Sequence, residues 1–215
     1  MTLFKVNPKL EQVAYEIVLD SVVFTVDNFY EDPDEVVEFI MGQETPLHRE
    51  GERLSQNGVA FEDRRLNTSH EGMAEVTQLL MQLSEQDAQF AVEDVSAERY
   101  RFLTRDDNPY EDRVWNPTKT PGYVAFVYLN SGTYAGTNLY APQTIYPTDG
   151  LPQHAAPWKS RHLWPILKSI TAKYNRMVMF DGNKFVHGMA VNDDRFFDEE
   201  RVSQIMFFTP SQNGG

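Results

Sequence analysis

The chain has 215 residues, of which 41% are hydrophobic and 13% aromatic, enough for one domain with a sizeable core. Thirty-two acidic residues against 19 basic ones give a formal net charge of -13, which argues against nucleic acid as a partner. The absence of cysteine excludes disulfides, thiolate metal sites and a cysteine nucleophile. No apolar run approaches the ~18 residues of a membrane span, and the first residues lack a signal-peptide core, so we expect a cytoplasmic protein without a membrane partner.

The N-terminal part, about residues 15–90, is expected to hold strands followed by helices. Residues 15–26 are rich in β-branched and aromatic side chains and predict one or two strands. Asp32 is a good N-cap for a helix that begins at Pro33, and residues 44–70 are polar and predict a loop. A second helix is predicted over residues 73–85 from an apolar stripe at helical spacing. The stripe consists of Met73, Val76, Leu79, Leu80 and Leu83.

The C-terminal part, about residues 98–208, alternates strand signals with turns. Strands are predicted at 99–104 and 137–140, and a helix at 163–174 with Pro165 in its first turn. The segment 122–130, GYVAFVYLN, is apolar at both odd and even positions, which predicts a central strand buried on both faces.

The last quarter of the chain predicts three further strands. They cover residues 176–180, 185–190 and 201–208. The Asp181-Gly182-Asn183 turn between the first two is typical of a hairpin. These elements predict a mainly β, α+β fold over residues 1–215, with a sandwich or distorted barrel flanked by N-terminal helices.

Two polar residues interrupt the last apolar strands. His187 lies within a predicted strand, as either a hydrogen-bonded core residue or a ligand. Arg201 opens the final strand and needs a carboxylate partner, supplied by either the acidic loop before it or a small molecule. The usual phosphate-loop, zincin and hydrolase motifs are absent from the sequence.

The ordered series GYVAFVYLN, GTNLY, NRMVMFDGNKFVHGMAV and RVSQIMFF resembles the 2-oxoglutarate/Fe(II)-dependent oxygenase superfamily. It is most similar to poorly characterised members common in marine bacteria and phages. The N-terminal VVFTVDNFYEDPDEVVEFI resembles the opening segment of the same group. The resemblance spans about residues 20–208 and implies a double-stranded β-helix, or jelly roll, with N-terminal helices packed on one sheet.

The resemblance also implies a site with Fe(II) and 2-oxoglutarate as cofactors. In this family a His-x-Asp pair and a distal histidine hold iron and leave positions open for 2-oxoglutarate and O₂. His187 then matches the distal metal ligand. Arg201 matches the residue that binds the far carboxylate of 2-oxoglutarate, and Tyr128 is the second residue expected to bind this cofactor.

The first metal-binding motif departs from the family pattern. No histidine lies between His70 and His154, so no His-x-Asp pair precedes the GYVAFVYLN strand. One register places Val114-Trp115-Asn116 there, with Asn116 as a weak oxygen ligand; another places Tyr110-Glu111-Asp112 there, with Asp112 as a carboxylate ligand. His154 is a further substitute. An incomplete set binds Fe(II) much more weakly than a full triad.

Three functions therefore remain open. The first is an iron-dependent hydroxylase of an unknown small-molecule or peptide substrate. The second is a non-catalytic jelly roll that binds a ligand or assembles, with a homo-oligomer among its forms. The third is a cupin-like protein, ranked last because no early strand carries several histidines.

Overall fold

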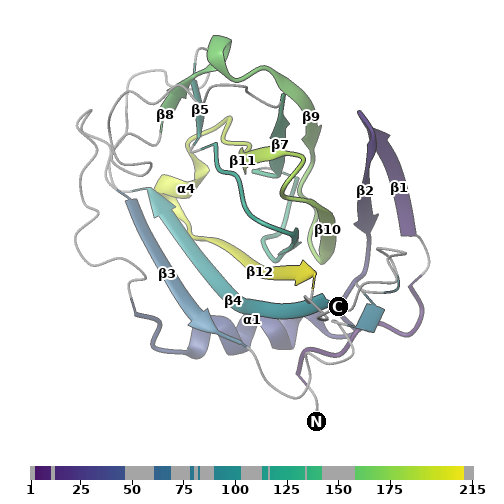
Figure 1. Cartoon of the computed structure of the whole chain (residues 1–215). Helices are drawn as coiled ribbons and strands as arrows, with labels where there is room; N and C mark the ends of the chain where they lie inside the picture. Colours follow the sequence, from purple (N-terminus) through teal and green to yellow (C-terminus); the bar gives the residue numbers. More distant parts are fainter. Residues whose placement is uncertain are drawn as a thin grey trace.

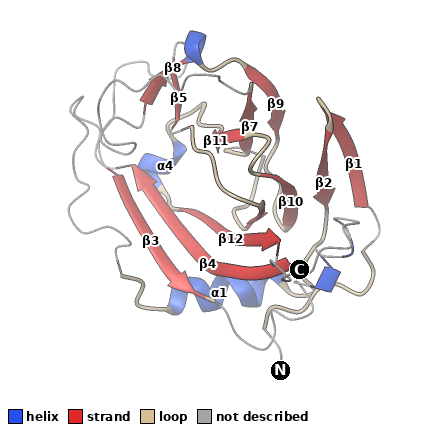
Figure 2. Cartoon of the chain, viewed as in Figure 1, coloured by secondary structure: helices blue, strands red, loops and turns tan. Residues whose placement is uncertain are grey.

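The computed structural model describes residues 3–10, 13–46, 61–68, 78–79, 82, 90–102, 113–115, 117–133, 135–141 and 158–210. Two antiparallel sheets dominate this part of the chain (Figures 1 and 2). The large sheet contains, in spatial order, β1 (Val13–Val18), β2 (Ser21–Val26), β10 (Arg176–Asp181), β6 (Tyr123–Tyr128), β12 (Arg201–Pro210), β4 (Phe90–Phe102) and β3 (Phe61–Asn67).

The small sheet faces the large one. It consists of β11 (Val186–Met189), β7 (Thr137–Tyr140) and β9 (Ile166–Ile170), while β5 (Arg113–Trp115) pairs with β8 (Trp158–Ser160). An isolated bridge between Thr118 and His187 connects the segment after β5 to β11. From β4 onward the chain therefore passes repeatedly between the two sides, a path consistent with a jelly-roll-like fold.

The central strand β6 buries both of its faces, as its sequence predicts. Val124 and Phe126 lie in the core cluster between the sheets. Ala125 and Val127 lie in the cluster on the opposite face, together with Val36 from the N-terminal helix. Alternation along the strand sends successive side chains to opposite faces, so β6 joins the two cores.

Helix α1 (Pro33–Gly42) lies along the outer face of the large sheet (Figure 1). The Asp32 side chain accepts a hydrogen bond from the Glu35 backbone N–H at 3.2 Å, and Pro33 occupies the first turn, which confirms the predicted start. None of the helices in the described part of the chain has the length and hydropathy needed to cross a lipid bilayer.

Two predictions of local structure were wrong. The range 44–70, predicted as loop, contains β3 over its described residues 61–67. The predicted helix at 163–174 is instead a short 3-10 turn, η1 (Arg161–Leu163), followed by β9. In both segments, strand pairing with a neighbour outweighs local propensity: β3 pairs with β4, and β9 pairs with β7.

The Asp181-Gly182-Asn183 turn does not form the predicted hairpin. Its Asn183 backbone N–H bonds to Asp181 Oδ1 at 2.8 Å, so the local turn chemistry is as expected. However, β10 pairs with β2 and β6, whereas β11 pairs with β7. The turn therefore carries the chain from the large sheet to the small one.

The other predicted strands are found. β1 and β2 cover the first strand segment, and β4, β7, β10, β11 and β12 cover the later ones, with β4 and β12 longer than predicted. The acidic loop before β12 contains a short helix, α4 (Arg195–Asp198). The predicted helix at 73–85 lies outside the described residues except for positions 78, 79 and 82, which are helical.

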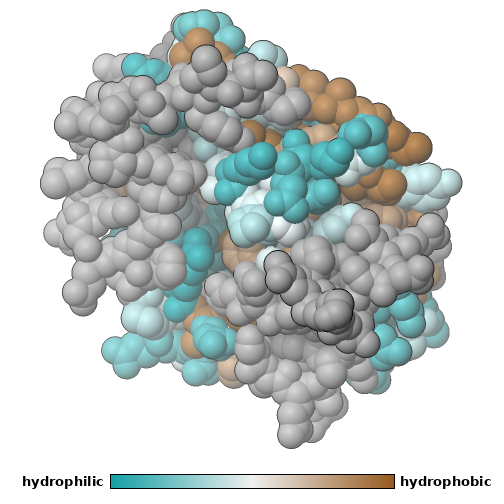
Figure 3. All heavy atoms as spheres, viewed as in Figure 1, coloured by the Kyte–Doolittle hydropathy of each residue, from teal (hydrophilic) through white to brown (hydrophobic). Residues whose placement is uncertain are grey.

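Exposed hydrophobic side chains gather on the side of the molecule formed by β9 and the β1–β2 edge (Figure 3). Tyr15 is 71% exposed and Ile17 66% exposed on β1, and Leu167 is 38% exposed on β9. An ion pair of 2.6 Å between Lys168 Nζ and Glu16 Oε2 joins the two strands. The barrel thus keeps an apolar outer flank at the free edge of its large sheet.

Candidate functional site

A cavity of about 160 Å³ lies inside the barrel. The inner faces of the strands line it, because alternate residues of each strand point inward. On β3 these are Phe61, Asp63 and Arg65, and on β12 they include Arg201, Ile205 and Phe207. β4 contributes Glu98 and Tyr100, β11 contributes His187, and the segment after β5 contributes Thr118 and Thr120.

His187 is a buried, neutral histidine on the cavity wall. It is 6% exposed, and its ring makes edge contacts with the rings of Phe126 and Phe180, at centroid distances of 5.8 and 5.0 Å. Its Nδ1 lies 3.4 Å from the Phe185 carbonyl oxygen. Burial lowers the pKa of His187 to about 4, although the bond to Phe185 opposes this shift. The imidazole is therefore uncharged at neutral pH.

The residue directly opposite His187 is a threonine. Thr118 and His187 exchange two backbone hydrogen bonds, of 2.7 and 2.8 Å, so their side chains lie on the same face of the pair. Thr120, two residues further on, also lines the cavity. Its buried Oγ1 has no hydrogen-bond partner among the described residues. Among the described residues, the side chains next to His187 on this wall are thus threonines, whereas iron binding would favour imidazole or carboxylate.

Arg201 is held from several sides with its guanidinium at the cavity. Nε donates to the Ala135 carbonyl oxygen at 3.4 Å, and Nη1 donates to Ser203 Oγ at 3.0 Å. The guanidinium carbon lies 5.9 Å from the centroid of the Tyr128 ring, within cation–π range. The Tyr128 hydroxyl bonds to Thr137 Oγ1 at 2.7 Å, and burial raises the pKa of Tyr128.

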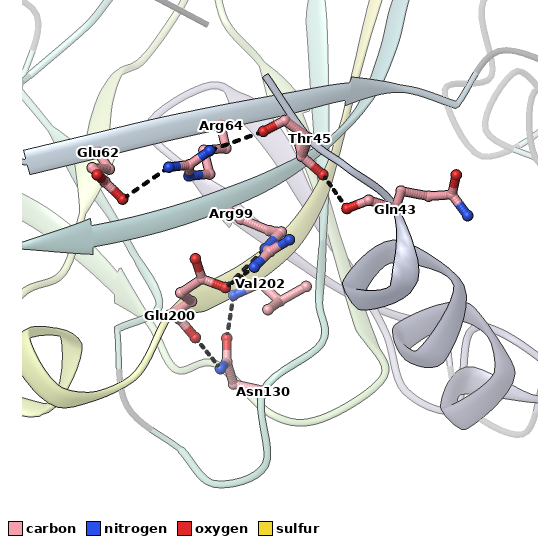
Figure 4. Close-up of polar contacts among 8 residues, drawn as sticks. All are labelled: Gln43, Thr45, Glu62, Arg64, Arg99, Asn130, Glu200 and Val202. Carbon is pink, nitrogen blue, oxygen red and sulfur yellow. Dashed lines mark hydrogen bonds and ion pairs between the residues drawn. The ribbon is translucent and has the colours of Figure 1, made fainter. Parts of the chain in front are cut away.

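Asn130 fixes the backbone on both sides of Arg201 (Figure 4). Its Nδ2 donates to the Glu200 carbonyl oxygen at 2.8 Å, and its Oδ1 accepts from the Val202 backbone N–H at 2.6 Å. The Glu200 side chain accepts a hydrogen bond from Arg99 Nε at 2.8 Å. The last residue of the GYVAFVYLN segment therefore sets where β12 begins.

Charged side chains from β3, β4 and β12 form an alternating row at the cavity. Arg65 Nη2 lies 3.1 Å from Glu98 Oε1, and Arg201 Nη1 lies 3.6 Å from Glu98 Oε2. Arg65 Nε lies 3.5 Å from Asp63 Oδ1. Burial raises the pKa of Glu98, and the Asp63 charge raises it further, whereas both arginines lower it. Arg65 and Glu98 face each other in the β3–β4 register, which explains their pairing.

The structure brings His187 and Arg201 to one cavity and places Tyr128 against Arg201. Asp112, Asn116 and His154 lie outside the described residues, so their predicted or substitute metal roles remain predictions. The described residues contain no group of three or more histidine, aspartate or glutamate side chains arranged to hold a metal ion.

Sequence reasoning missed the β3 and β4 side of the site. Asp63 and Arg65 lie in a range assigned to loop, although Phe61, Asp63 and Arg65 alternate as one face of a strand would. Thr118 and Thr120 are also two residues apart, the spacing of side chains on one face of an extended segment. The role of Asn130 in fixing the backbone beside Arg201 could not be predicted from neighbouring residues in the sequence, because its hydrogen-bond partners lie 70 and 72 residues away.

No family model matches the chain, and no curated protein matches it. Among solved structures, the chain is similar to an oxidoreductase of the 2OG-Fe(II) oxygenase family from Burkholderia pseudomallei, with 10% identity over 87% of this chain and 84% of that chain, and a TM-score of 0.49. A Pseudomonas putida prolyl-4-hydroxylase shows 12% identity over 94% of this chain and 95% of that one, with a TM-score of 0.44.

HygX from Streptomyces hygroscopicus, whose structure has nickel and 2-oxoglutarate bound, shows 11% identity over 88% of this chain and 83% of its own, with a TM-score of 0.47. Because the identities are 10 to 12% and the TM-scores are below 0.5, these similarities do not assign a role to any residue of this chain. The role of each site residue is therefore argued from the geometry of the chain itself.

Proposed function

We propose that this chain is an oxygenase-like jelly-roll protein, related to the 2-oxoglutarate/Fe(II)-dependent oxygenases, whose barrel cavity binds a small organic carboxylate through Arg201. The observation that carries the proposal is the place of Arg201, 6% exposed, on the wall of the same cavity as His187. Its Nε and Nη1 are engaged, and Nη2 has no hydrogen-bond partner among the described residues. A fixed guanidinium with a free amino group suits one carboxylate.

The described residues do not fit the metal set of this superfamily. His187 is accompanied by Thr118 and Thr120, and neutral hydroxyls are poor partners for Fe(II) in comparison with imidazole or carboxylate. The cavity carboxylates of Asp63 and Glu98 form ion pairs with arginines instead. The described part of the site therefore supports carboxylate binding by Arg201 that does not depend on iron.

An iron-dependent hydroxylase is the second candidate. The family resemblance assigns its distal metal ligand to His187 and its carboxylate anchor to Arg201, and these two residues share the cavity. Its remaining ligands would have to come from Asp112, Asn116 or His154. With the full set in place, iron would supply oxidative hydroxylation of a substrate at the expense of 2-oxoglutarate.

Titration calorimetry of metal-stripped protein separates the two candidates. We expect propionate to bind in the presence of EDTA, and Arg201→Met to abolish this binding. Arg64→Met is the matched control, because Arg64 bonds to Thr45 and Glu62 instead of lining the cavity (Figure 4). Absence of carboxylate binding to the wild-type protein, with and without metal, would overturn the proposal.

The same titration with Mn(II) in place of EDTA tests the hydroxylase. Mn(II) binding that is lost in His187→Ala and tightened by 2-oxoglutarate would establish a metal site and replace the proposal with the second candidate. Succinate formed from 2-oxoglutarate with Fe(II) and ascorbate, above a His187→Ala control, would establish the hydroxylase by its activity.

A further inference from the structure

The hydrogen-bonding state of His187 restricts what its free nitrogen can recognise. Nδ1 faces the Phe185 carbonyl oxygen, which can only accept a hydrogen bond, so in the neutral ring Nδ1 carries the proton. Nε2 is then an acceptor, and it has no hydrogen-bond partner among the described residues. A ligand that pairs with Nε2 must therefore offer a donor, such as a hydroxyl group.

The segment that pairs with β11 supplies the complementary chemistry. Thr120 Oγ1 is buried without a hydrogen-bond partner in the described part of the chain, and its hydroxyl can donate to a ligand oxygen. Leaving such a buried group unpaired costs free energy, so a ligand oxygen that meets it gains affinity. A carbonyl oxygen can accept from Thr120 but cannot donate to His187, whereas a hydroxyl group can do both.

The charges of the cavity favour a ligand with one carboxylate. Arg201 offers one free amino group, Nη2, because its Nη1 lies 3.6 Å from Glu98 Oε2, and Arg65 is paired with Asp63 and Glu98. A second carboxylate on the ligand would lie in a cavity that already contains the Asp63 and Glu98 carboxylates. Like charges at short range in a buried site repel strongly, so a dicarboxylate is disfavoured.

The volume limits the ligand to a few carbon atoms. The cavity measures about 160 Å³, and an engineered cavity of roughly 150 Å³ accommodates benzene, which has about six heavy atoms. Three apolar side chains also line the cavity and can contact a short carbon chain: Phe126, Ile205 and Phe207.

We propose that the barrel cavity selects a small hydroxymonocarboxylate, with the carboxylate on Arg201 and the hydroxyl donating to His187 Nε2. The proposal rests on carboxylate binding by Arg201, as argued above, and adds the ligand class. It distinguishes this cavity from one that chelates a 2-oxo acid on a metal, since a 2-oxo group has no proton for Nε2. Thr120 donates to the same end of the ligand.

The experiment is ligand-observed NMR and titration calorimetry in EDTA with matched three- and four-carbon acids. Lactate is compared with pyruvate and propionate, and 3-hydroxybutyrate with acetoacetate and butyrate. We expect each hydroxy acid to bind roughly tenfold or more tightly than its oxo and deoxy counterparts, since an unpaired buried polar group carries a penalty of about 1–3 kcal/mol.

Variants assign the preference to its residues. His187→Phe keeps a ring against Phe126 and Phe180 and should remove the preference for hydroxy acids, so that lactate binds no more tightly than propionate. Thr120→Val should reduce the same preference. His162→Phe, at an exposed histidine outside the cavity, is the control and should change nothing. Circular dichroism and melting temperatures confirm that each variant is folded.

The outcomes separate the two proposals. Equal binding of hydroxy, oxo and deoxy acids, all lost in Arg201→Met, would overturn the hydroxy-acid preference but leave carboxylate binding intact. No binding of any acid to the wild-type protein would overturn both. Tight binding of a 2-oxo acid that requires Mn(II) would also overturn both and identify a metal site.

Discussion

The Asp27 carboxylate fixes the junction between β2 and β10. Arg176 Nε lies 2.6 Å from Oδ1 and Nη2 lies 3.1 Å from Oδ2, a two-pronged contact, and Lys173 Nζ lies 2.8 Å from Oδ2. The hydrogen bonds from Arg176 are the largest cause that lowers the pKa of Asp27 to about 2. Burial acts in the opposite direction but is outweighed. An ion pair of this geometry contributes more than an isolated surface pair.

This contact predicts a defined dependence of stability on pH. Because the folded-state pKa of Asp27 is below its ordinary value of 3.8, its stabilisation is complete above that value and is lost as pH falls toward about 2. We expect Asp27→Asn to lower the free energy of unfolding by about 1–2 kcal/mol at pH 7, and by less at pH 3. Urea unfolding at both pH values measures the difference.

Asp20→Asn is the matched control for this prediction. Asp20 pairs with Lys184 at 3.0 Å on the surface, where both side chains are largely exposed, so its removal should leave the urea midpoint unchanged. Equal losses in the two variants, or a loss at Asp27 that does not change with pH, would contradict the role assigned to Arg176.

At the scale of the strands, the close contact between β7 and β9 depends on Gly136. A Cβ atom at this position would lie 1.8 Å from the Ile170 carbonyl oxygen and 2.7 Å from the Ala172 nitrogen, both backbone atoms that cannot rotate away. Gly136→Ala should therefore separate the strands and cost at least about 3 kcal/mol of unfolding free energy, the upper range for overpacking. Thermal unfolding followed by circular dichroism tests this.

Gly42 provides the contrast within the same experiment. It ends α1, and a Cβ there would meet nothing within 4 Å. Gly42→Ala should stabilise the protein by about 0.5–1 kcal/mol through helix propensity and lower chain entropy in the unfolded state. A melting temperature of Gly136→Ala at or above that of Gly42→Ala would refute the steric argument.

The strand β6 and its continuation into Leu129 form the centre of the large sheet. Leu129 is 3% exposed in the core cluster beneath α1, and its backbone N–H bonds to the Val202 carbonyl oxygen at 3.1 Å. Leu129→Ala should lower the free energy of unfolding by about 2–5 kcal/mol, the range for a truncated core leucine. The urea midpoint should fall with an unchanged m-value.

Leu167→Ala is the control for Leu129, because Leu167 is a leucine of β9 with 38% of its surface exposed. The change there should stay within about 0.5 kcal/mol. A cost at Leu167 comparable to that at Leu129 would mean that the apolar flank of β9 is covered in solution.

At the scale of the whole molecule, the formal net charge of -13 means that the acidic side chains repel one another. Individual ion pairs reduce this repulsion only locally. Raising NaCl from about 20 to 300 mM shortens the Debye length from roughly 20 Å to roughly 6 Å and screens this repulsion. We expect the melting temperature to rise by about 2–4 °C, which corresponds to roughly 1 kcal/mol. A fall in melting temperature would show that salt weakens the ion pairs more than it relieves the net repulsion.

Much of the fold is encoded locally. The Asp32–Pro33 start of α1, the both-faces-apolar run of β6 and the β-branched segment of β1 and β2 are all visible in the sequence, because cap chemistry and side-chain alternation act over a few residues. The prediction of a helix over 163–174 was wrong because β9 is stabilised by pairing with β7, whose residues lie 26 or more positions earlier in the chain.

The sequence by itself determined the strand-rich core, the central strand and the candidate status of His187 and Arg201, because each depends on residue type and local period. Only the tertiary structure decided which sheet each strand enters, and hence that the Asp181-Gly182-Asn183 turn crosses between sheets. It also decided that Thr118 lies opposite His187 and that Glu98 lies between Arg65 and Arg201. These placements follow from long-range register, which no local pattern carries.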